Sequence, residues 1–238
     1  ALSATCDVAP LPSPPLPIPP VLGVVYSVGA SIAVPAAEPF PHPLCGDRAW
    51  ARWLAADLGR GLVVSAAGGA RLADVLDCGD GPPSVCDVGA DAVLIVLYAW
   101  GWDAKDAQPP RGESWTAADE AADDTARNLS RDTLRLILAE FLTRAPLARI
   151  VVGGYWQGEP STAWDRERMP LWRAMVAHEV EAVGGEMEAA HRTLRTGCAV
   201  GYTCDGRHLN AGGAGVVYRS VRELVLPAAC ACQGEGGA

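Results

Sequence analysis

Two short segments of the sequence carry side chains suited to acyl transfer, and the first of them contains Ser31. This serine stands in a Gly-Ala-Ser-Ile sequence directly after an apolar run that ends at Val28. A serine on a strand-to-helix turn presents its hydroxyl at the edge of a sheet, and the backbone amides that follow can stabilise negative charge there. The segment is not a Gly-x-Ser-x-Gly elbow, because Ala33 fills the last position. Alone, the sequence around Ser31 is also typical of an ordinary turn.

The second segment, near the C-terminus, contains Asp205 and His208 in the sequence Asp-Gly-Arg-His-Leu-Asn. An aspartate three residues before a histidine can accept a hydrogen bond from Nδ1–H. The Nε2 atom is then free to take a proton from a serine hydroxyl. The simpler interpretation is an aspartate that caps a turn beside a surface histidine.

Alternating apolar runs and helical patterns predict the elements that position these segments. Strands are expected at 21–28, 62–64, 92–99 and 149–152, and helices at 48–58, 117–144, 170–183 and 212–224. Continuous apolar strands separated by helices indicate a parallel sheet covered on both faces. We therefore expect an α/β fold, a three-layer α/β/α sandwich with a mostly parallel sheet of about five strands. Ligands bind beyond the carboxyl ends of such strands, which is where Ser31 falls.

In this order the two segments resemble the blocks of the SGNH (GDSL-like) hydrolase superfamily, which has a Ser block after strand one and a late Asp-x-x-His-x-Asn block. The resemblance extends from about Val21 to Leu226 and includes a Val-Val-Ser-Ala-Ala-Gly-Gly turn similar to the second block. It implies a flavodoxin-like sandwich with Ser31 as nucleophile, His208 as general base and Asp205 orienting that base. It also implies an oxyanion hole.

The oxyanion hole implied by the resemblance contains the backbone amide of Ser31 and that of Gly69, or of Gly68 if the alignment shifts by one residue. Three positions depart from the superfamily pattern. Ala30 replaces the Asp of Gly-Asp-Ser, Ser65 stands where the second block has Asn, and the third block, at 98–103, has no Asn. Loss of one oxyanion donor lowers the rate by about 100- to 1,000-fold.

Two tryptophans, Trp100 and Trp102, occupy the third block in place of the missing Asn. An indole N–H is a hydrogen-bond donor and could replace the lost amide. Tryptophans in loops at strand ends also suit sugar rings or acyl chains, so both are expected to bind substrate. Tryptophan is, however, also a common packing residue.

The eight cysteines are an even number, which indicates disulfides formed in an oxidising compartment. Zinc is the alternative, and the absence of any Cys-x-x-Cys pair disfavours it. Cys78/Cys86 and Cys198/Cys204 each bracket a turn-rich segment, as bridges that close loops do; the pairing of Cys6, Cys45, Cys230 and Cys232 stays open. A glycosylation sequon at Asn128 is consistent with secretion.

The composition excludes some classes of protein. The 238 residues are 50% hydrophobic with a formal charge of −9, which disfavours nucleic-acid binding. No apolar stretch is long enough for a transmembrane helix. We expect a Pro-rich arm at 1–20, one domain at 21–228 and a Cys/Gly-rich tail at 229–238. The chain begins at Ala1 without Met, as after removal of a signal peptide or at a boundary chosen for expression. The histidines other than His208 lack ligand spacing, so no metal or cofactor is expected: His42, His178 and His191.

The function expected from the sequence is that of a secreted serine ester hydrolase acting on acylated carbohydrate or a related ester. A lipid or small ester remains open as the substrate. The alternative is a catalytically degenerate SGNH-like domain that serves as a carbohydrate-binding or structural part of an extracellular wall or matrix. The missing Asn and Asp favour this alternative, whereas the retained Ser31, Asp205 and His208 oppose it.

Overall fold

The structure is a computed structural model that describes residues 23–30, 50–79, 81–108, 115–154, 166–190, 194, 202 and 209–226. The Pro-rich arm and the Cys/Gly-rich tail expected from the sequence lie outside these residues. Among the described helices, none is long and apolar enough to cross a membrane.

Five parallel strands form one sheet in the order β2-β1-β3-β4-β5. The strands are β1 Val24–Gly29, β2 Gly61–Ala66, β3 Ala92–Tyr98, β4 Arg149–Val152 and β5 Glu186–Met187. Because sequential strands run first to one side of β1 and then to the other, the connections change direction between β1 and β3. That change marks the place where ligands bind in open α/β sheets.

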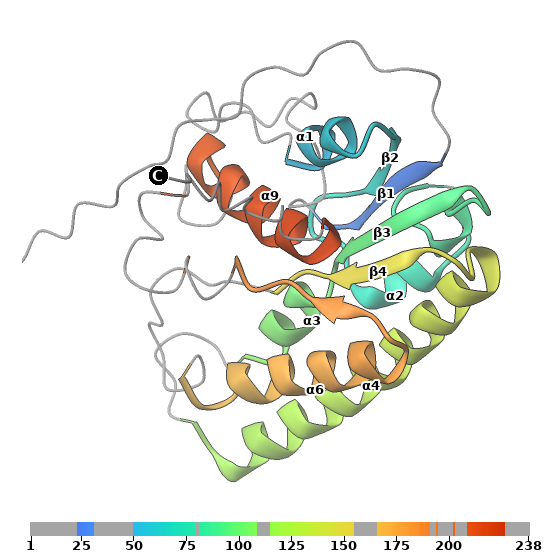
Figure 1. Cartoon of the computed structure of the whole chain (residues 1–238). Coiled ribbons are helices and arrows are strands. Elements are labelled where there is room, and N and C mark those ends of the chain that lie inside the picture. The colour runs from blue at the N-terminus through green and yellow to red at the C-terminus, as the bar shows by residue number, and fades with distance from the viewer. Residues whose placement is uncertain are drawn as a thin grey trace, which may run out of the picture.

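Helices cover both faces of the sheet, so the predicted three-layer sandwich is confirmed (Figure 1). On one face lie α1 Trp50–Asp57 and α9 Ala211–Val225, and on the other α2 Leu72–Leu76, α3 Gly101–Asp106, α4 Ala117–Arg144 and α6 Met169–Ala182. A short 3₁₀ helix, η1 Val85–Asp87, precedes β3. The predicted helix at 117–144 and the predicted strand at 149–152 have the bounds expected from the sequence.

Alternation along the central strand β3 separates the core into two layers. Leu94 and Val96 pack with Trp50 of α1, while Ile95 and Leu97 pack with Ile137 of α4. Successive side chains of a strand point to opposite faces, so a run that is apolar throughout needs cover on both. Helices therefore pack against both faces of the sheet, and the loops that follow the strands begin from this packed core.

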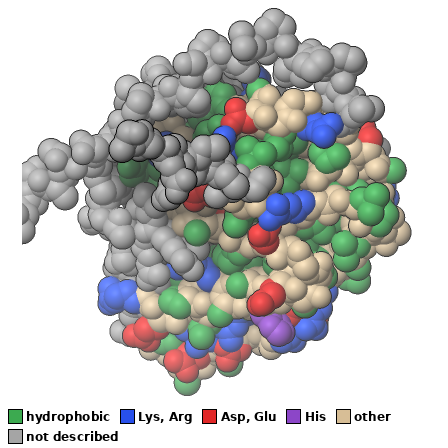
Figure 2. All heavy atoms as spheres, viewed as in Figure 1, with side chains coloured by type: hydrophobic (Ala, Val, Ile, Leu, Met, Phe, Trp, Pro, Cys, Tyr) green, Lys and Arg blue, Asp and Glu red, His purple; other side chains and the backbone are tan. Residues whose placement is uncertain are grey.

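The outer surface of the α4–α6 layer is polar. On the face of the molecule that Figure 2 shows, Lys or Arg and Asp or Glu side chains are interspersed over this region. Arg135 of α4 donates two hydrogen bonds, of 2.6 and 2.9 Å, to the carboxylate of Glu179 on α6. The Glu179 hydrogen bond raises the pKa of Arg135, as expected for a paired guanidinium. Charged contacts thus link the two helices outside their apolar interface.

Candidate active site

The ends of β1, β2 and β3 meet at one point of the carboxyl edge. Gly29, the last residue of β1, pairs with Ala66 of β2 and with Tyr98 of β3. Beyond these pairs the backbone N–H of Ala67 donates to the carbonyl of Gly29 at 2.9 Å, and that of Ala30 donates to the carbonyl of Tyr98 at 2.5 Å. The chain is therefore fixed on both sides up to the residue before Ser31.

The three residues of the expected triad, Ser31, Asp205 and His208, lie outside the described residues. The structure does describe the residue before Ser31 and the residue after His208. Ser31 comes directly after the pinned Ala30, and His208 comes directly before Leu209, which is buried against the α1–α9 layer. Their mutual geometry stays a prediction of the sequence.

Asn210, the last residue of the Asp-x-x-His-Leu-Asn segment, begins helix α9. Its side-chain oxygen accepts a hydrogen bond from the Gly213 N–H at 3.0 Å, which caps the helix. Its own N–H donates to the carbonyl of Tyr202 at 2.9 Å. This asparagine therefore fixes the point at which the chain leaves His208.

Gly68 and Gly69 lie in the turn after β2 and border an open cleft. Gly69 has a φ of +80°, a conformation that favours glycine, and no atom lies within 4 Å of where a Cβ would stand on either residue. The cleft has a volume of about 450 Å³. Its lining consists of Ala67, Gly68, Gly69, Ala70, Arg71, Asp74, Asp77, Gly79, Gly81, Pro82 and Pro83. The expected oxyanion glycines are thus next to a space that could admit a ligand.

Three charged side chains line this cleft: two carboxylates and one guanidinium. Asp74 and Asp77 face the space together with Arg71, whose Nε lies 2.6 Å from Asp106 Oδ2. Excess negative charge disfavours an anionic ligand, whereas carboxylates readily accept hydrogen bonds from hydroxyl groups. The chemistry of the lining therefore suits a neutral, hydroxyl-rich molecule.

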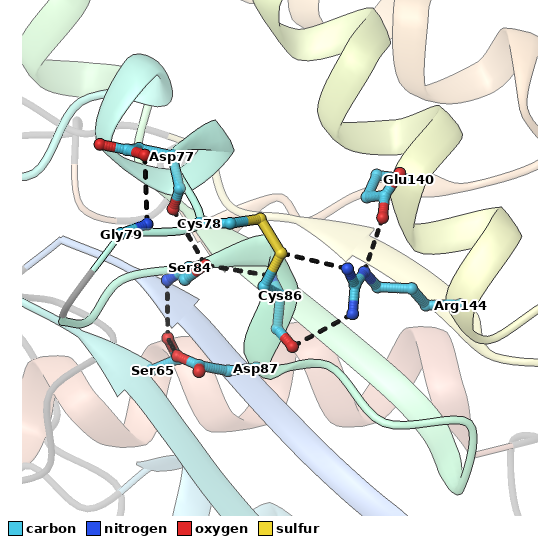
Figure 3. The surroundings of a disulfide bond; sticks show 9 residues. All are labelled: Ser65, Asp77, Cys78, Gly79, Ser84, Cys86, Asp87, Glu140 and Arg144. Carbon is cyan, nitrogen blue, oxygen red and sulfur yellow. Dashed lines mark hydrogen bonds and ion pairs between the residues drawn. A yellow bond between two sulfur atoms is a disulfide. The ribbon is translucent and has the colours of Figure 1, made fainter.

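Ser65, which stands where the superfamily has Asn, is engaged in holding the next loop. Its hydroxyl donates to Asp87 Oδ2 at 2.5 Å and accepts from the Ser84 N–H at 2.8 Å (Figure 3). The side chain is buried, so these two contacts account for its position. Ser65 supports the 84–87 segment and does not replace the missing amide donor.

Trp100 and Trp102 differ in their surroundings. Trp100 is 1% exposed and donates its indole N–H to the carbonyl of Gly153 at 2.8 Å. The expectation that Trp100 offers its indole to a substrate does not hold in this arrangement, because the ring packs in the core and joins the ends of β3 and β4. Trp102 is only half-buried, with the ammonium of Lys105 4.2 Å from its ring centroid. Trp102 therefore remains the tryptophan that can face a ligand.

Asp103, one residue after Trp102, bridges the loops that follow β2 and β3. Its Oδ2 accepts from the Leu72 N–H at 3.0 Å, at the start of α2, and its Oδ1 lies 3.5 Å from the hydroxyl of Ser130 on α4. Burial raises the pKa of Asp103 from 3.8 to about 6, although the Leu72 hydrogen bond opposes this shift. The Asp103 carboxylate thus joins the loop after β3 to the start of α2, although burial of its charge is unfavourable.

We expect Asp103→Asn to stabilise the protein at pH 7, by about 1–3 kcal/mol. An asparagine oxygen can still accept from Leu72, while the buried charge is removed. Since the folded state raises this pKa, the wild type loses stability as the pH rises from about 4 to 6 and changes little above. Urea unfolding of both proteins between pH 4 and 8 should show a gap that opens over this window. A variant less stable than wild type at pH 7 would mean that the charge itself is favourable.

A buried carboxylate that sequence reasoning missed, Glu188, follows β5. It accepts hydrogen bonds from the backbone N–H groups of Gly154 at 2.8 Å and Ala190 at 2.5 Å. Burial raises the pKa of Glu188, and these donors oppose the shift. Glu188 fixes the start of the loop after β4, and no spacing in its Gly-Gly-Glu-Met-Glu sequence signals this role.

Within the part of the chain described, no group of three or more Cys, His, Asp or Glu could hold a metal ion.

Comparison with known proteins supports the fold. No family model matches the chain, and no curated protein matches it by sequence. Among solved structures, an extracellular lipase from Streptomyces rimosus shares 20% identity at a TM-score of 0.56, covering 82% of this chain and 96% of its own. An acetylxylan esterase from Geobacillus stearothermophilus shares 14% at 0.58, with 85% and 93% covered.

A further solved structure with the same fold is described as GDSL-like. A protein described as a GDSL-like lipase, from Parabacteroides merdae, shares 13% identity at a TM-score of 0.60, with 88% of this chain and 98% of its own covered. At identities this low, the three matches show that the fold is shared. The chain therefore has the fold of the SGNH (GDSL-like) hydrolases, as a divergent example of it.

Proposed function

We propose that the chain is a serine ester hydrolase that acts on acylated carbohydrate or a related ester. The observation that carries the proposal is the junction at the carboxyl edge. Hydrogen bonds fix β1 up to Ala30, directly before Ser31, against the turn that leads to Gly68 and Gly69. We therefore expect Ser31, the next residue, to lie at the topological switch point, where open α/β sheets bind ligands.

The reaction follows from the roles that the SGNH resemblance implies. Ser31 attacks the acyl carbonyl while His208, oriented by Asp205, takes the hydroxyl proton. The alcohol leaves with that proton, and water then releases the acid from the acyl-enzyme. Backbone N–H groups of Ser31 and of Gly69, or Gly68, stabilise the oxyanion, with the Trp102 indole N–H as a further donor.

The cleft supports a carbohydrate as the alcohol part of the substrate. Its carboxylates, Asp74 and Asp77, suit sugar hydroxyls, and its net negative lining disfavours a phospholipid headgroup. The acetylxylan esterase among the structural neighbours acts on an acylated sugar polymer by its name. We further propose that the protein works outside the cell, which the Cys78–Cys86 disulfide and the expected sequon at Asn128 support.

A second candidate is a degenerate domain that binds carbohydrate without hydrolysing it. The observation that favours it is the engagement of two side chains in structural contacts: Ser65 holds Asp87 and Ser84, and Trp100 holds Gly153. Neither is free to replace the amide donor of the superfamily. An oxyanion hole short of one donor would be slow, and a slow site could persist for binding alone.

Labelling with a fluorophosphonate tests the proposal directly. An activated serine displaces fluoride and forms a covalent bond to phosphorus, whereas an ordinary serine does not. We expect folded wild type to be labelled on the peptide that contains Ser31, and Ser31→Ala and His208→Ala to remain unlabelled. Heat-denatured wild type controls for non-specific reaction. An unlabelled, oxidised and folded wild type that still binds oligosaccharides would support the second candidate.

A substrate panel then separates the classes of ester. We expect faster release of acetate from an acetylated xylo-oligosaccharide than of fatty acid from a neutral or an anionic lipid ester. Addition of the deacetylated oligosaccharide should inhibit hydrolysis of a small chromogenic acetate by occupying the cleft. Equal rates on all three substrates, without this inhibition, would count against carbohydrate as the substrate.

A further inference from the structure

The disulfide between Cys78 and Cys86 has two sulfur atoms in different surroundings (Figure 3). Cys78 is exposed, whereas Cys86 is half-buried. A guanidinium nitrogen of Arg144 lies 3.1 Å from the Sγ of Cys86, and another donates to the Cys86 carbonyl at 3.2 Å. One sulfur therefore has a positive charge beside it, and the other belongs to the more exposed residue of the pair.

Arg144 is held in this position by contacts at both ends. Its Nε donates to Glu140 at 2.7 Å, one turn earlier on α4. The acidic groups next to the disulfide already have partners: Asp77 accepts from the Gly79 N–H at 3.1 Å, and Asp87 accepts from Ser65. Glu140 binds Nε and offsets part of the guanidinium charge, while the other two guanidinium nitrogens contact the sulfur and the carbonyl of Cys86. The charged group in direct contact with the Cys86 sulfur is therefore a cation.

We propose that Cys78–Cys86 is a redox-active disulfide that a thiol reductant opens by attack at Cys78. In the first step the reductant thiolate forms a bond to the Cys78 sulfur, and the Cys86 sulfur departs with the electron pair of the broken bond. In the second step another thiolate attacks the reductant sulfur, which releases Cys78 as a thiolate and leaves the reductant oxidised. The lower the pKa of the departing thiol, the faster it leaves. Arg144 stabilises the Cys86 thiolate, as a neighbouring cation does.

Opening the bridge affects the cleft because the bridged loop supplies one of its walls. Gly79, Gly81, Pro82 and Pro83 lie between the two cysteines, and all line the cleft. The hydrogen bonds of Ser84 to Ser65 and to the Asp77 carbonyl do not involve the sulfur atoms, so we expect them to hold the second half of the loop after reduction. Reduction is therefore expected to loosen the wall without unfolding the domain. The assignment does not depend on the proposed esterase activity.

Trapping the mixed disulfide shows which sulfur is attacked. Oxidised wild type is exposed briefly to glutathione, free thiols are blocked with iodoacetamide, and the protein is cleaved before aspartates, which separates the two cysteines. We expect glutathione on Cys78 and the alkyl group on Cys86. The reverse pattern, or equal labelling of both, would overturn the proposal.

Substitution of Arg144 tests the role of its charge. We expect Arg144→Gln to slow reduction of this bridge by dithiothreitol about three- to tenfold, and Arg144→Lys to slow it less. Arg222→Gln is the matched control, because Arg222 forms a similar half-exposed ion pair with Asp57 on the opposite face of the sheet. An unchanged rate in Arg144→Gln would contradict the proposal.

A pair of single-cysteine variants gives an answer even if Arg144→Gln fails to fold. In Cys78→Ser the remaining Cys86 thiol should titrate at lower pH than the Cys78 thiol of Cys86→Ser, as measured from the pH dependence of alkylation. Arg144 lies beside only the first of these thiols. Equal titration, or a lower pKa for Cys78, would overturn the assignment of Cys86 as the leaving thiol.

Discussion

Asp123→Ala should lower the free energy of unfolding by about 3–5 kcal/mol, measured by urea denaturation. Asp123 lies on α4 and is completely buried. Its Oδ2 accepts hydrogen bonds from Arg127 at 3.0 Å and from Arg168 at 2.8 Å, and its Oδ1 accepts from the indole N–H of Trp172 at 2.9 Å. Trp172 belongs to α6, so one carboxylate joins the two helices that cover this face of the sheet.

The large effect follows from what the substitution leaves behind. The Trp172 side chain is fully buried, so its N–H would lose its partner without gaining water. An unsatisfied buried donor costs about 1–3 kcal/mol. Arg127 and Arg168 are mostly buried and would lose the buried one of the two carboxylates that they share, which adds the larger part of the cost. Asp123→Asn keeps an acceptor for the indole and should fall between wild type and Asp123→Ala.

The neighbouring residue provides a matched control. Asp124 pairs with the same arginines, at 2.6 Å for Arg127, but half of its side chain is exposed. The hydrogen bond from Arg127 lowers the pKa of Asp124, yet ion pairs exposed to solvent contribute little to stability. Asp124→Ala should therefore have a small effect. If both variants lost the same stability, burial of Asp123 would not be what makes the network strong.

The parts of the fold that the sequence predicts well are those whose pattern has a single physical interpretation. The helix at 117–144 begins at a capping box of Thr116 and Asp119 and stops before Pro146, and each of these signals is local. The central strand is apolar throughout because both faces are covered. Cys78 and Cys86 bracket a segment rich in Gly, Pro and Asp, and the predicted bridge between them is confirmed.

Short elements escaped prediction because tertiary contacts define them. Helix α2 has five residues and β5 has two, which is too few for a hydrophobic period to be recognised. The fold still required a fifth strand, although its position could not be read from the residues. Helix α3 begins directly after Trp100, where the sequence indicated only a loop.

At the candidate site, too, contacts made only on folding could not be predicted from the sequence. That Ser31 follows β1 could be predicted from the pattern of strands, whereas its relation to Asp205 and His208 stays a prediction. The roles of Trp100 and Ser65 do not follow, because a residue type does not reveal which partner its N–H or hydroxyl will meet. Glu188 was missed for the same reason: its donors are backbone groups brought together only by folding.

Gly29→Ala is expected to lower the free energy of unfolding by about 2–6 kcal/mol and to abolish fluorophosphonate labelling. Gly29 has a backbone φ of +126°, a value that residues other than glycine rarely adopt. A Cβ at this position would stand 2.3 Å from the carbonyl oxygen of Tyr98 and 2.6 Å from its carbonyl carbon. Backbone strain of about 1–3 kcal/mol therefore adds to overpacking of about 1–3 kcal/mol.

A control at Gly59 separates the two contributions. Gly59 has a φ of +61°, and no atom lies within 4 Å of the place where a Cβ would stand. Gly59→Ala should therefore show the strain of the left-handed backbone alone, about 1–2 kcal/mol. If Gly29→Ala cost no more than Gly59→Ala, close packing against Tyr98 would not be important at this junction.

Labelling measured together with stability separates an effect of Gly29 on the position of Ser31 from an effect on folding. The clash falls on the same Tyr98 carbonyl that accepts the Ala30 N–H, so any shift that relieves it disturbs the hydrogen bond that holds the residue before Ser31. At a temperature where both glycine variants remain folded, Gly59→Ala should label like wild type and Gly29→Ala should not. A Gly29→Ala protein that is folded and fully labelled would show that Ser31 is positioned by something other than this junction. Loss of labelling in the folded variant alone would mean that the glycine, by letting β1 and β3 approach, sets the place of the nucleophile.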